Sequence, residues 1–393
     1  MGKTRMWGGL AAVLTAALVG LTACGGGTGA PAASGGPSGG ASGAPSSSSA
    51  AAPTKIKLQL QWVAQAQFAG YYAAVDQGYY SDAGLDVQIV EGGPDIVPQD
   101  VLSAGDVDYA ISWVPKVLGS IEKGAKITDV AQIFERSGTT QISLKDKAIT
   151  SPAQFAGKNV GSWGYGNEWE LFAGMQKDGV DVKNVKLVQQ AFDMNGFLAG
   201  DIDAAQAMTY NEYAQVLETK NPKTGKLFTA VDLNVINWNK VGTAMLQDAI
   251  WANSDKLSDP AYAEQTTKFI KASIKGWVYA RDNAEQAAKI VTAAGSSLGE
   301  SHQLWQTNEV NKLIWPSTTG VGIISDAAWK QTVDIAMGTK NETGATIITK
   351  APPETAKSNT YVEKALAELK SEGVDVEGKS FAPITVTLNE GGS

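Results

Sequence analysis

A short pattern that occurs twice constrains the fold of this chain more than any other feature of its sequence. Residues 104–108 read Ala-Gly-Asp-Val-Asp, and residues 199–203 read Ala-Gly-Asp-Ile-Asp. Each copy ends a short helical pattern and leads into an apolar run, and glycine suits the left-handed residue that ends such a helix. The repeat therefore predicts two similar units with the same order of strands and helices.

The segments around each copy support two units of this kind. The first is predicted to contain strands at 56–60, 85–90 and 109–112 and helices at 68–77 and 96–104. The second is predicted to contain strands at 159–162, 185–188 and 204–208, a helix at 168–177 and a short helix from residue 195. Short apolar runs that alternate with helical stretches are typical of βαβ units. The predicted fold is therefore α/β, with mainly parallel sheets flanked by helices.

The second half of the chain is mainly helical. After predicted strands at 231–236 and 244–252, a helix begins at Pro260 with Asp259 as its cap, and further helices are predicted at 284–293, 303–314, 326–337 and 362–370. A helical tail of this length is expected to return to the first unit and pack on it. The chain would then cross between the units twice, near 142–146 and 242–246.

Aromatic and acidic residues occupy matching places in the two units. The matched positions are Trp62 and Trp163 after the first strand, Asp95 and Asp193 after the second, and Trp113 and Tyr210 after the third. Ligands of α/β sheets bind at the carboxyl ends of the strands, where these residues stand. We therefore predict that the two units face each other across a shared cleft. The alternative is that the related units simply bury their aromatic residues in the same way.

The residues predicted to bind a ligand combine aromatic faces with a few polar groups. They are Trp62, Tyr71, Asp95, Trp113, Trp163, Asn167, Glu168, Tyr210, Asn211 and Glu212. Tryptophan and tyrosine suit a flat heterocycle. Asp95 can accept a hydrogen bond from an amine, or it can cap a helix that begins at Ile96. These loops hold no lysine or arginine, which favours a neutral or amine-bearing ligand over a sulfonate.

The N-terminus predicts export and lipidation. Lys3 and Arg5 precede an apolar run at 6–21, which is too short to span a membrane, and residues 21–24 read Leu-Thr-Ala-Cys. We expect a signal peptide at 1–23, a lipid on Cys24 and a flexible linker at 24–54, rich in Gly, Ser, Ala and Pro. The protein would then be anchored to the outer face of the cell membrane. The alternative is an ordinary signal peptide with an incidental cysteine.

Composition argues against several classes of function. The net charge of −8 disfavours a nucleic-acid partner. Cys24 is the sole cysteine and His302 the sole histidine, so thiol chemistry, a metal site and a catalytic triad are not expected. His302 is expected to be a surface or capping residue. We predict no cofactor and no enzymatic activity.

Several segments of the first unit resemble a known family. Residues 58–62 read Leu-Gln-Leu-Gln-Trp, 70–74 read Gly-Tyr-Tyr-Ala-Ala, 78–80 read Gly-Tyr-Tyr, and 83–87 read Ala-Gly-Leu-Asp-Val. With 104–109, they resemble substrate-binding proteins of ABC importers, in the branch for thiamine pyrimidine precursors, alkanesulfonates and riboflavin. The resemblance covers roughly 55–257.

The resemblance implies a type II-like periplasmic-binding-protein fold. Lobe 1 would comprise 55–145 plus 245–393, and lobe 2 would comprise 146–244, with the ligand cleft between them. The partners implied are a small-molecule ligand, an ABC permease and its ATPase, and we expect a monomer.

The resemblance also bears on the ligand and on a competing function. It implies a thiamine pyrimidine moiety, such as a formylaminopyrimidine or a hydroxymethylpyrimidine, with riboflavin or an alkanesulfonate as alternatives. A fungal pyrimidine-forming enzyme resembles the same receptors, but its family carries a cysteine-rich motif and a histidine where this chain has Phe68. A receptor is therefore favoured over an enzyme, and also over an adhesion or sensor protein, for which no partner domain is visible.

Overall fold

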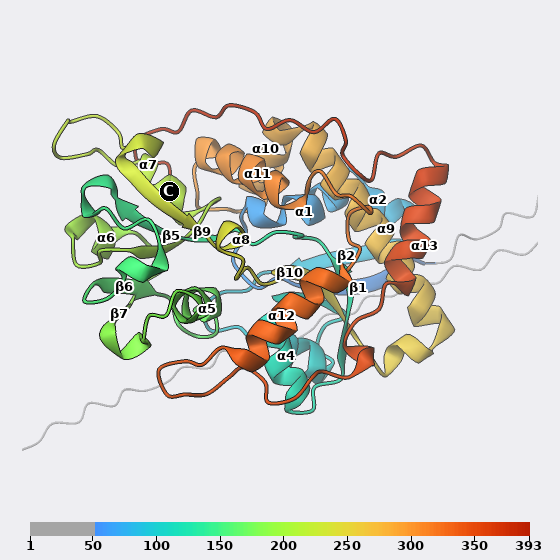
Figure 1. Ribbon diagram of the computed structural model, residues 1–393. Coiled ribbons are helices and arrows are strands. Elements are labelled where there is room, and N and C mark those ends of the chain that lie inside the picture. The colour runs from blue at the N-terminus through green and yellow to red at the C-terminus, as the bar shows by residue number, and fades with distance from the viewer. Residues whose placement is uncertain (1–51) are drawn as a thin grey trace, which may run out of the picture. The chain divides into compact units, whose positions relative to one another are not determined.

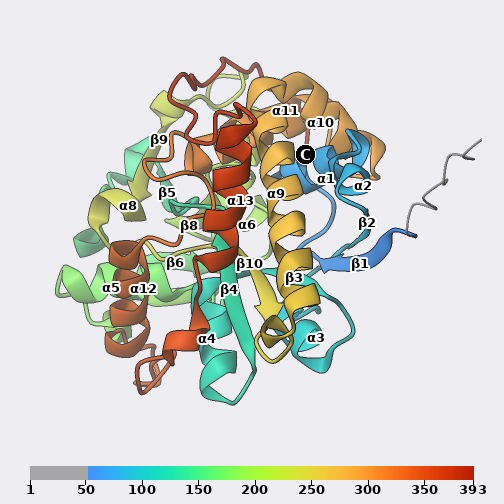
Figure 2. The ribbon, with the colours of Figure 1, turned by 90° about the vertical axis from the view of Figure 1, so that its right-hand side faces the viewer.

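The computed structural model describes residues 52–393, which Figures 1 and 2 show in two views. The predicted signal peptide, the lipidation site Cys24 and most of the predicted linker lie outside these residues. Within 52–393, no helix combines the length and apolarity that crossing a membrane requires.

A five-stranded sheet contains the strands predicted for the first unit. Its strand order is β2-β1-β3-β10-β4. The bounds are β1 (Thr54–Gln59), β2 (Leu85–Val90), β3 (Tyr109–Trp113), β4 (Ile127–Gln132) and β10 (Asp248–Asn253). Strands β2, β1 and β3 are parallel, whereas β10 runs antiparallel to both β3 and β4. The carboxyl ends of β1 and β3 therefore meet the beginning of β10.

The strands of the second unit form two smaller sheets. Their bounds are β5 (Thr139–Leu144), β6 (Asn159–Ser162), β7 (Lys186–Gln189), β8 (Ala205–Met208) and β9 (Leu233–Asn237). An antiparallel sheet has the order β8-β5-β9, and β6 pairs with β7 in parallel. A parallel bridge from Val160 to Ala204 brings β6 beside β8. The sheets are thus mixed rather than mainly parallel, because β5 and β10 run against their neighbours.

The chain passes between the two groups of strands twice (Figure 1). It leaves β4 at Gln132 and enters β5 at Thr139, so the first passage occupies 133–138. This passage precedes the predicted position at 142–146, since β5 already pairs with β8 and β9. The return runs through 238–247 and includes the predicted 242–246. The division into lobes with boundaries after 145 and 244 stays a prediction.

The predicted helices agree closely with those of the structure, which also contains the unpredicted α2, α4, α7 and α8. The helix bounds are α1 (Ala69–Asp76), α2 (Tyr79–Asp82), α3 (Pro98–Ala104), α4 (Val114–Glu122), α5 (Trp169–Lys177), α6 (Asn195–Ala199), α7 (Glu212–Leu217), α8 (Trp238–Val241), α9 (Pro260–Asp282), α10 (Ala284–Ala293), α11 (Glu300–Ile314), α12 (Asp326–Gly338) and α13 (Thr360–Ser371). Gly105 and Gly200 end α3 and α6 with φ of 85° and 88°, as the repeat predicts. Asp259 caps α9 through a 2.9 Å hydrogen bond from the amide of Ala261.

The helical tail does return to the five-stranded sheet. Helix α9 packs against both α1 and α13, and α13 lies beside it in both views (Figures 1 and 2). The contact with α1 is close because both helices present a glycine: a Cβ on Gly70 would overlap the ring of Trp277, and one on Gly276 would overlap the backbone of Gly70. This contact fixes α1 over the core.

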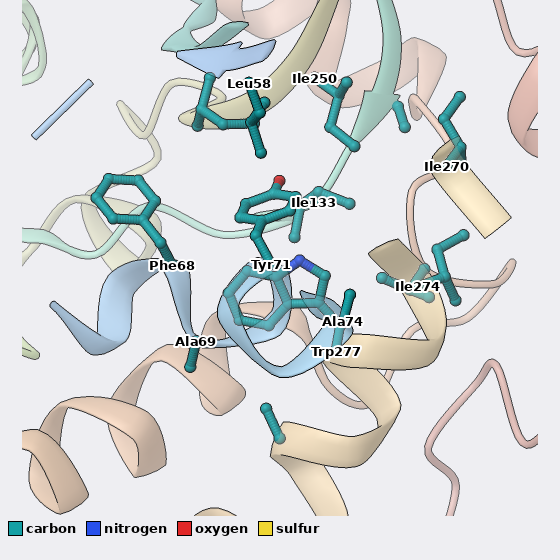
Figure 3. Close-up of a cluster of buried hydrophobic side chains, with 14 of the residues drawn as sticks. Leu58, Phe68, Ala69, Tyr71, Ala74, Ile133, Ile250, Ile270, Ile274 and Trp277 are labelled. Carbon is teal, nitrogen blue, oxygen red and sulfur yellow. The ribbon is translucent and has the colours of Figure 1, made fainter. Parts of the chain in front are cut away.

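Tyr71 belongs to that core (Figure 3). Its ring meets Trp277 edge-on, with ring centroids 5.5 Å apart and an interplanar angle of 81°. Leu58 of β1 and Ile250 of β10 belong to the same buried cluster. Burial of each such side chain stabilises the fold by roughly 1.5–3 kcal/mol. The tyrosine that follows Gly70 is therefore a packing residue.

Candidate ligand-binding site

A cavity of about 800 Å³ lies where loops from both groups of strands meet. Most of its lining comes from the segments after β1, β2 and β3 of the five-stranded sheet and from those after β6, β7 and β8. These are the carboxyl ends of strands, where the matched aromatic residues were expected. Cavities of this size are typical of small-molecule sites, which range from about 300 to 1,000 Å³.

Most of the predicted binding residues line this cavity. The lining includes Trp62, Asp95, Trp113, Trp163, Asn167, Tyr210, Asn211 and Glu212. Tyr71 does not, because it is only 1% exposed and faces α9. Glu168 is also absent from the lining; its carboxylate accepts a 2.9 Å hydrogen bond from the amide of Gly166 in its own loop. Direct contact of these residues with a ligand stays a prediction.

Aromatic rings from both groups of strands meet at the cavity. Phe192, in the loop after β7, lies 4.7 Å from Trp62 and 6.3 Å from Trp163 between ring centroids. It is nearly parallel to Trp163, at 24°, and 39% exposed. The sequence analysis did not predict Phe192 as a site residue, although Phe192 directly precedes Asp193, one of the matched positions. The three rings thus form one aromatic cluster on the cavity lining, to which Trp163 contributes little surface because it is only 3% exposed.

A buried carboxylate organises the polar groups at the cavity. Asp248, at the start of β10, accepts hydrogen bonds from Gln61 (2.6 Å) and Trp113 (2.7 Å) on Oδ1 and from Gln67 (2.9 Å) on Oδ2. Burial raises the pKa of Asp248 to about 7. Because the indole N–H of Trp113 is bound to Asp248, this tryptophan offers a ligand its face. Asp248 was not predicted, since it comes 135 residues after Trp113.

The cavity also contains basic residues, contrary to the sequence-based expectation. Lys116 and Lys123 line it from α4, a helix that the sequence did not predict. The Nζ of Lys116 lies 5.1 Å from the ring centroid of Trp113. Burial lowers the pKa of Lys116 to about 8. The argument against an anionic ligand therefore fails, because it considered the loops alone; Lys116 lies one helical turn beyond Trp113.

The polar residues after β8 are held in place by buried partners. Glu212 accepts hydrogen bonds from the amide of Met208 (2.9 Å) and from Asn211 Nδ2 (2.8 Å). His302 Nε2 lies 3.0 Å from Asn211 Oδ1, and its Nδ1 lies 3.0 Å from Glu218 Oε2. The expectation of a surface or capping histidine is wrong, because His302 is 0% exposed. It supports Asn211 from behind the cavity wall.

The loop after β2 excludes one of the two roles predicted for Asp95. Asp95 does not cap a helix, since α3 begins at Pro98 with Val97 at its N-cap; Asp95 is exposed and lines the cavity. In the same loop, a Cβ on Gly92 would lie 2.7 Å from the amide nitrogen of Trp62. Gly92 thus permits close packing of two backbone segments. Asp95 remains available to a ligand.

The loop after β6 has an unusual backbone. Gly164, Tyr165 and Gly166 all adopt positive φ, of 66°, 54° and 87°. Such values are uncommon for a residue with a side chain. Tyr165 lines the cavity and is 84% exposed. Strained residues of this kind cluster at ligand sites. Tyr165 is therefore a further candidate for contact with a ligand.

Comparison with known proteins identifies relatives of two kinds. A family model described as NMT1/THI5 like matches residues 65–287. The formylaminopyrimidine-binding protein of Halalkalibacterium halodurans is 24% identical over 60% of this chain and 69% of its own length. The 4-amino-5-hydroxymethyl-2-methylpyrimidine phosphate synthase of Aspergillus parasiticus is 22% identical over 42% of this chain and 48% of its own.

A solved structure confirms the predicted fold. The periplasmic sulfonate-binding protein SsuA of Methylobacillus flagellatus KT superimposes with a TM-score of 0.55, over 86% of this chain and 99% of that protein, at 16% sequence identity. The periplasmic-binding-protein fold implied by the residue motifs is therefore correct. At this identity the likeness concerns the fold alone.

Proposed function

Because the chain belongs to the NMT1/THI5-like family, we propose that it is an extracytoplasmic solute-binding protein that delivers a small heteroaromatic molecule to an ABC importer. The observation that carries the proposal is the meeting of Trp62, Phe192 and Trp163 around a cavity of about 800 Å³. Aromatic faces suit a flat ring, and a few hydrogen-bonding groups on the same lining fix its orientation.

We propose a pyrimidine precursor of thiamine as the ligand, such as a formylaminopyrimidine. The relative of that name supports this choice. The exposed carboxylate of Asp95 on the cavity lining supports it as well, because it can accept a hydrogen bond from an exocyclic amine.

Binding rather than catalysis is the better reading of the relationship to the synthases. The binding protein matches 60% of this chain and the fungal synthase 42%. According to the resemblance, the enzymes carry a histidine where this chain has Phe68. Phe68 is 0% exposed and belongs to the core (Figure 3). Phe68 therefore has a packing role in this protein, and it does not line the cavity.

Thermal denaturation of the full-length protein with candidate ligands tests the function. A ligand at 100 times its Kd stabilises the native state by about 2.7 kcal/mol, which corresponds to a rise in Tm of several degrees. We expect this rise with formylaminopyrimidine or hydroxymethylpyrimidine and none with alkanesulfonates. Stabilisation by riboflavin or sulfonates alone would contradict the assignment. Uptake of labelled pyrimidine by cells that lack the protein tests delivery to an importer.

The lipid anchor is a separate proposal with a separate test. Residues 21–24, which read Leu-Thr-Ala-Cys, support attachment of lipid to Cys24. We expect metabolic labelling with palmitate to mark the native protein and not the Cys24→Ser variant. Equal labelling of the two proteins would exclude Cys24 as the anchor.

A further inference from the structure

The buried acceptors of the cavity already have donors from the protein. Both carboxylate oxygens of Asp248 accept side-chain N–H groups, and both oxygens of Glu212 accept hydrogen bonds from Met208 and Asn211. The acidic side chains without such partners, Asp95 and Asp100, are exposed. Deep in the cavity, a ligand therefore finds few free acceptors.

Lys116 presents the opposite case, a donor without an acceptor. Its side chain is partly buried at the cavity, yet within 52–393 its ammonium group forms no hydrogen bond or ion pair, and Glu168 and Asp248 act on it only through space. Lys271, another partly buried lysine, contacts Glu368 at 3.0 Å and Glu372 at 2.5 Å. An unpaired ammonium in a sheltered position is costly. A ligand that supplies an acceptor removes this cost.

The surroundings of Lys116 hold it at this place. Its Nζ lies over the ring of Trp113, at 5.1 Å from the centroid. On the other side, the loop after β6 approaches its stem, since a Cβ on Gly166 would lie 3.5 Å from Lys116 Cγ. The ammonium group therefore lies where the two groups of strands meet, next to an aromatic wall of the cavity.

We propose that Lys116 donates a hydrogen bond to a carbonyl or carboxylate oxygen of the ligand, so that the protein selects acylated aminopyrimidines over the free amines. The inference rests on the proposed function and names the substituent that is recognised. A free aminomethyl group is protonated at neutral pH and is repelled by an ammonium group. Acylation of the amine removes that positive charge and adds a carbonyl oxygen, which can accept a hydrogen bond from Lys116.

Calorimetric titration of the full-length protein with matched ligands tests this selection. The ligands are formylaminopyrimidine and its deformylated amine, with benzoate and an alkanesulfonate as acceptors that lack the pyrimidine. The wild type should bind the formyl compound about tenfold or more tightly than the amine, as expected for a hydrogen bond to a charged group. Lys116→Met, which keeps the unbranched stem, should lose most of this preference, and Lys116→Glu should reverse it.

The control is Lys126→Met, which removes an exposed lysine just after α4 that lies outside the cavity lining and should leave the preference unchanged. Circular dichroism verifies the fold of each variant. If the wild type and Lys116→Met prefer the formyl compound equally, the role of Lys116 is refuted while the proposed function stands. If the wild type binds no pyrimidine but binds benzoate or the sulfonate through Lys116, the proposed function fails and the acceptor role survives.

Discussion

The two sides of the cavity are built differently. On the side of the five-stranded sheet, Gln61, Trp113 and Asp248 are joined by hydrogen bonds of 2.6 and 2.7 Å. On the side of the smaller sheets, Tyr165 and Phe192 are 84% and 39% exposed. The first side is organised by buried hydrogen bonds before a ligand arrives, whereas the second combines the held residues Asn211 and Glu212 with two exposed aromatic rings. Such a division suits a binding protein in which a ligand, held by one side, shifts the population toward closed conformations.

Removal of Asp248 should have the largest effect. In Asp248→Leu, the N–H groups of Gln61, Gln67 and Trp113 lose their acceptor, and each unsatisfied buried donor costs about 1–3 kcal/mol. We expect the free energy of unfolding, measured in urea, to fall by about 3 kcal/mol or more. Asp95→Leu, on the exposed rim, should change it by less than about 0.5 kcal/mol. Equal effects at the two sites would show that the sheet side is not specially organised.

Loss of Trp62 should weaken binding more than stability. Trp62→Ala removes an aromatic face and the neighbour of Phe192, so we expect affinity for a heteroaromatic ligand to fall by about 2 kcal/mol. Titration calorimetry measures the loss. Val63→Ala is the matched control, since Val63 is the next residue, is 41% exposed and lies outside the cavity lining. Unchanged affinity in Trp62→Ala would remove this ring from the site.

Binding should weaken in alkaline solution. Burial lowers the pKa of Lys116 to about 8 and raises that of Asp248 to about 7. Above pH 7.5 Asp248 is mostly ionised, so the change up to pH 9 reports mainly on Lys116, which loses its proton and donates more weakly. Affinity for an acceptor ligand should fall by up to about tenfold over this range, following the protonated fraction. The profile of Lys116→Met should be flat; a slope like that of the wild type would assign the titration elsewhere.

The smallest effect concerns the backbone at Tyr165. Tyr165→Gly relieves a left-handed conformation that costs about 1 kcal/mol, partly offset by a freer unfolded chain. We expect the free energy of unfolding to rise by less than about 1 kcal/mol. Val231→Gly, at a residue that is 78% exposed and has no positive φ, should lower it instead. A loss of stability in Tyr165→Gly would mean that the exposed ring packs on the cavity.

The sequence predicted the repeated strands and helices well because their apolar spacing is regular. It missed β5, whose residues are buried but largely polar. The hydroxyl of Thr140 and the amide nitrogen of Gln141 in that strand donate hydrogen bonds of 2.8 Å to the backbone carbonyls of Ala207, Gly161 and Ala204. Because these buried side chains are polar, no hydrophobic alternation marks the strand. Burial of a polar strand depends on partners that are distant in sequence.

The site could be predicted only where residues directly follow strands. Trp62, Trp113 and Trp163 could be found in this way. Asp248 and Lys116 could not be predicted in this way. Asp248 belongs to a strand much later in the sequence, and Lys116 belongs to a helix that was not predicted. Tyr71 was misplaced because helical spacing does not reveal which face meets α9.

The glycine contact between α1 and α9 has a consequence for how relatives are identified. Gly70 and Gly276 allow the two helices to touch, and residues 70–74 are one of the segments that carry the resemblance to the family. That motif records the spacing of two helices and carries no information about ligand chemistry. Searches that depend on it will gather transport proteins and enzymes that share a scaffold and differ in cargo. Comparison at the positions of Lys116, Phe192 and Asp248 should sort them by what they bind.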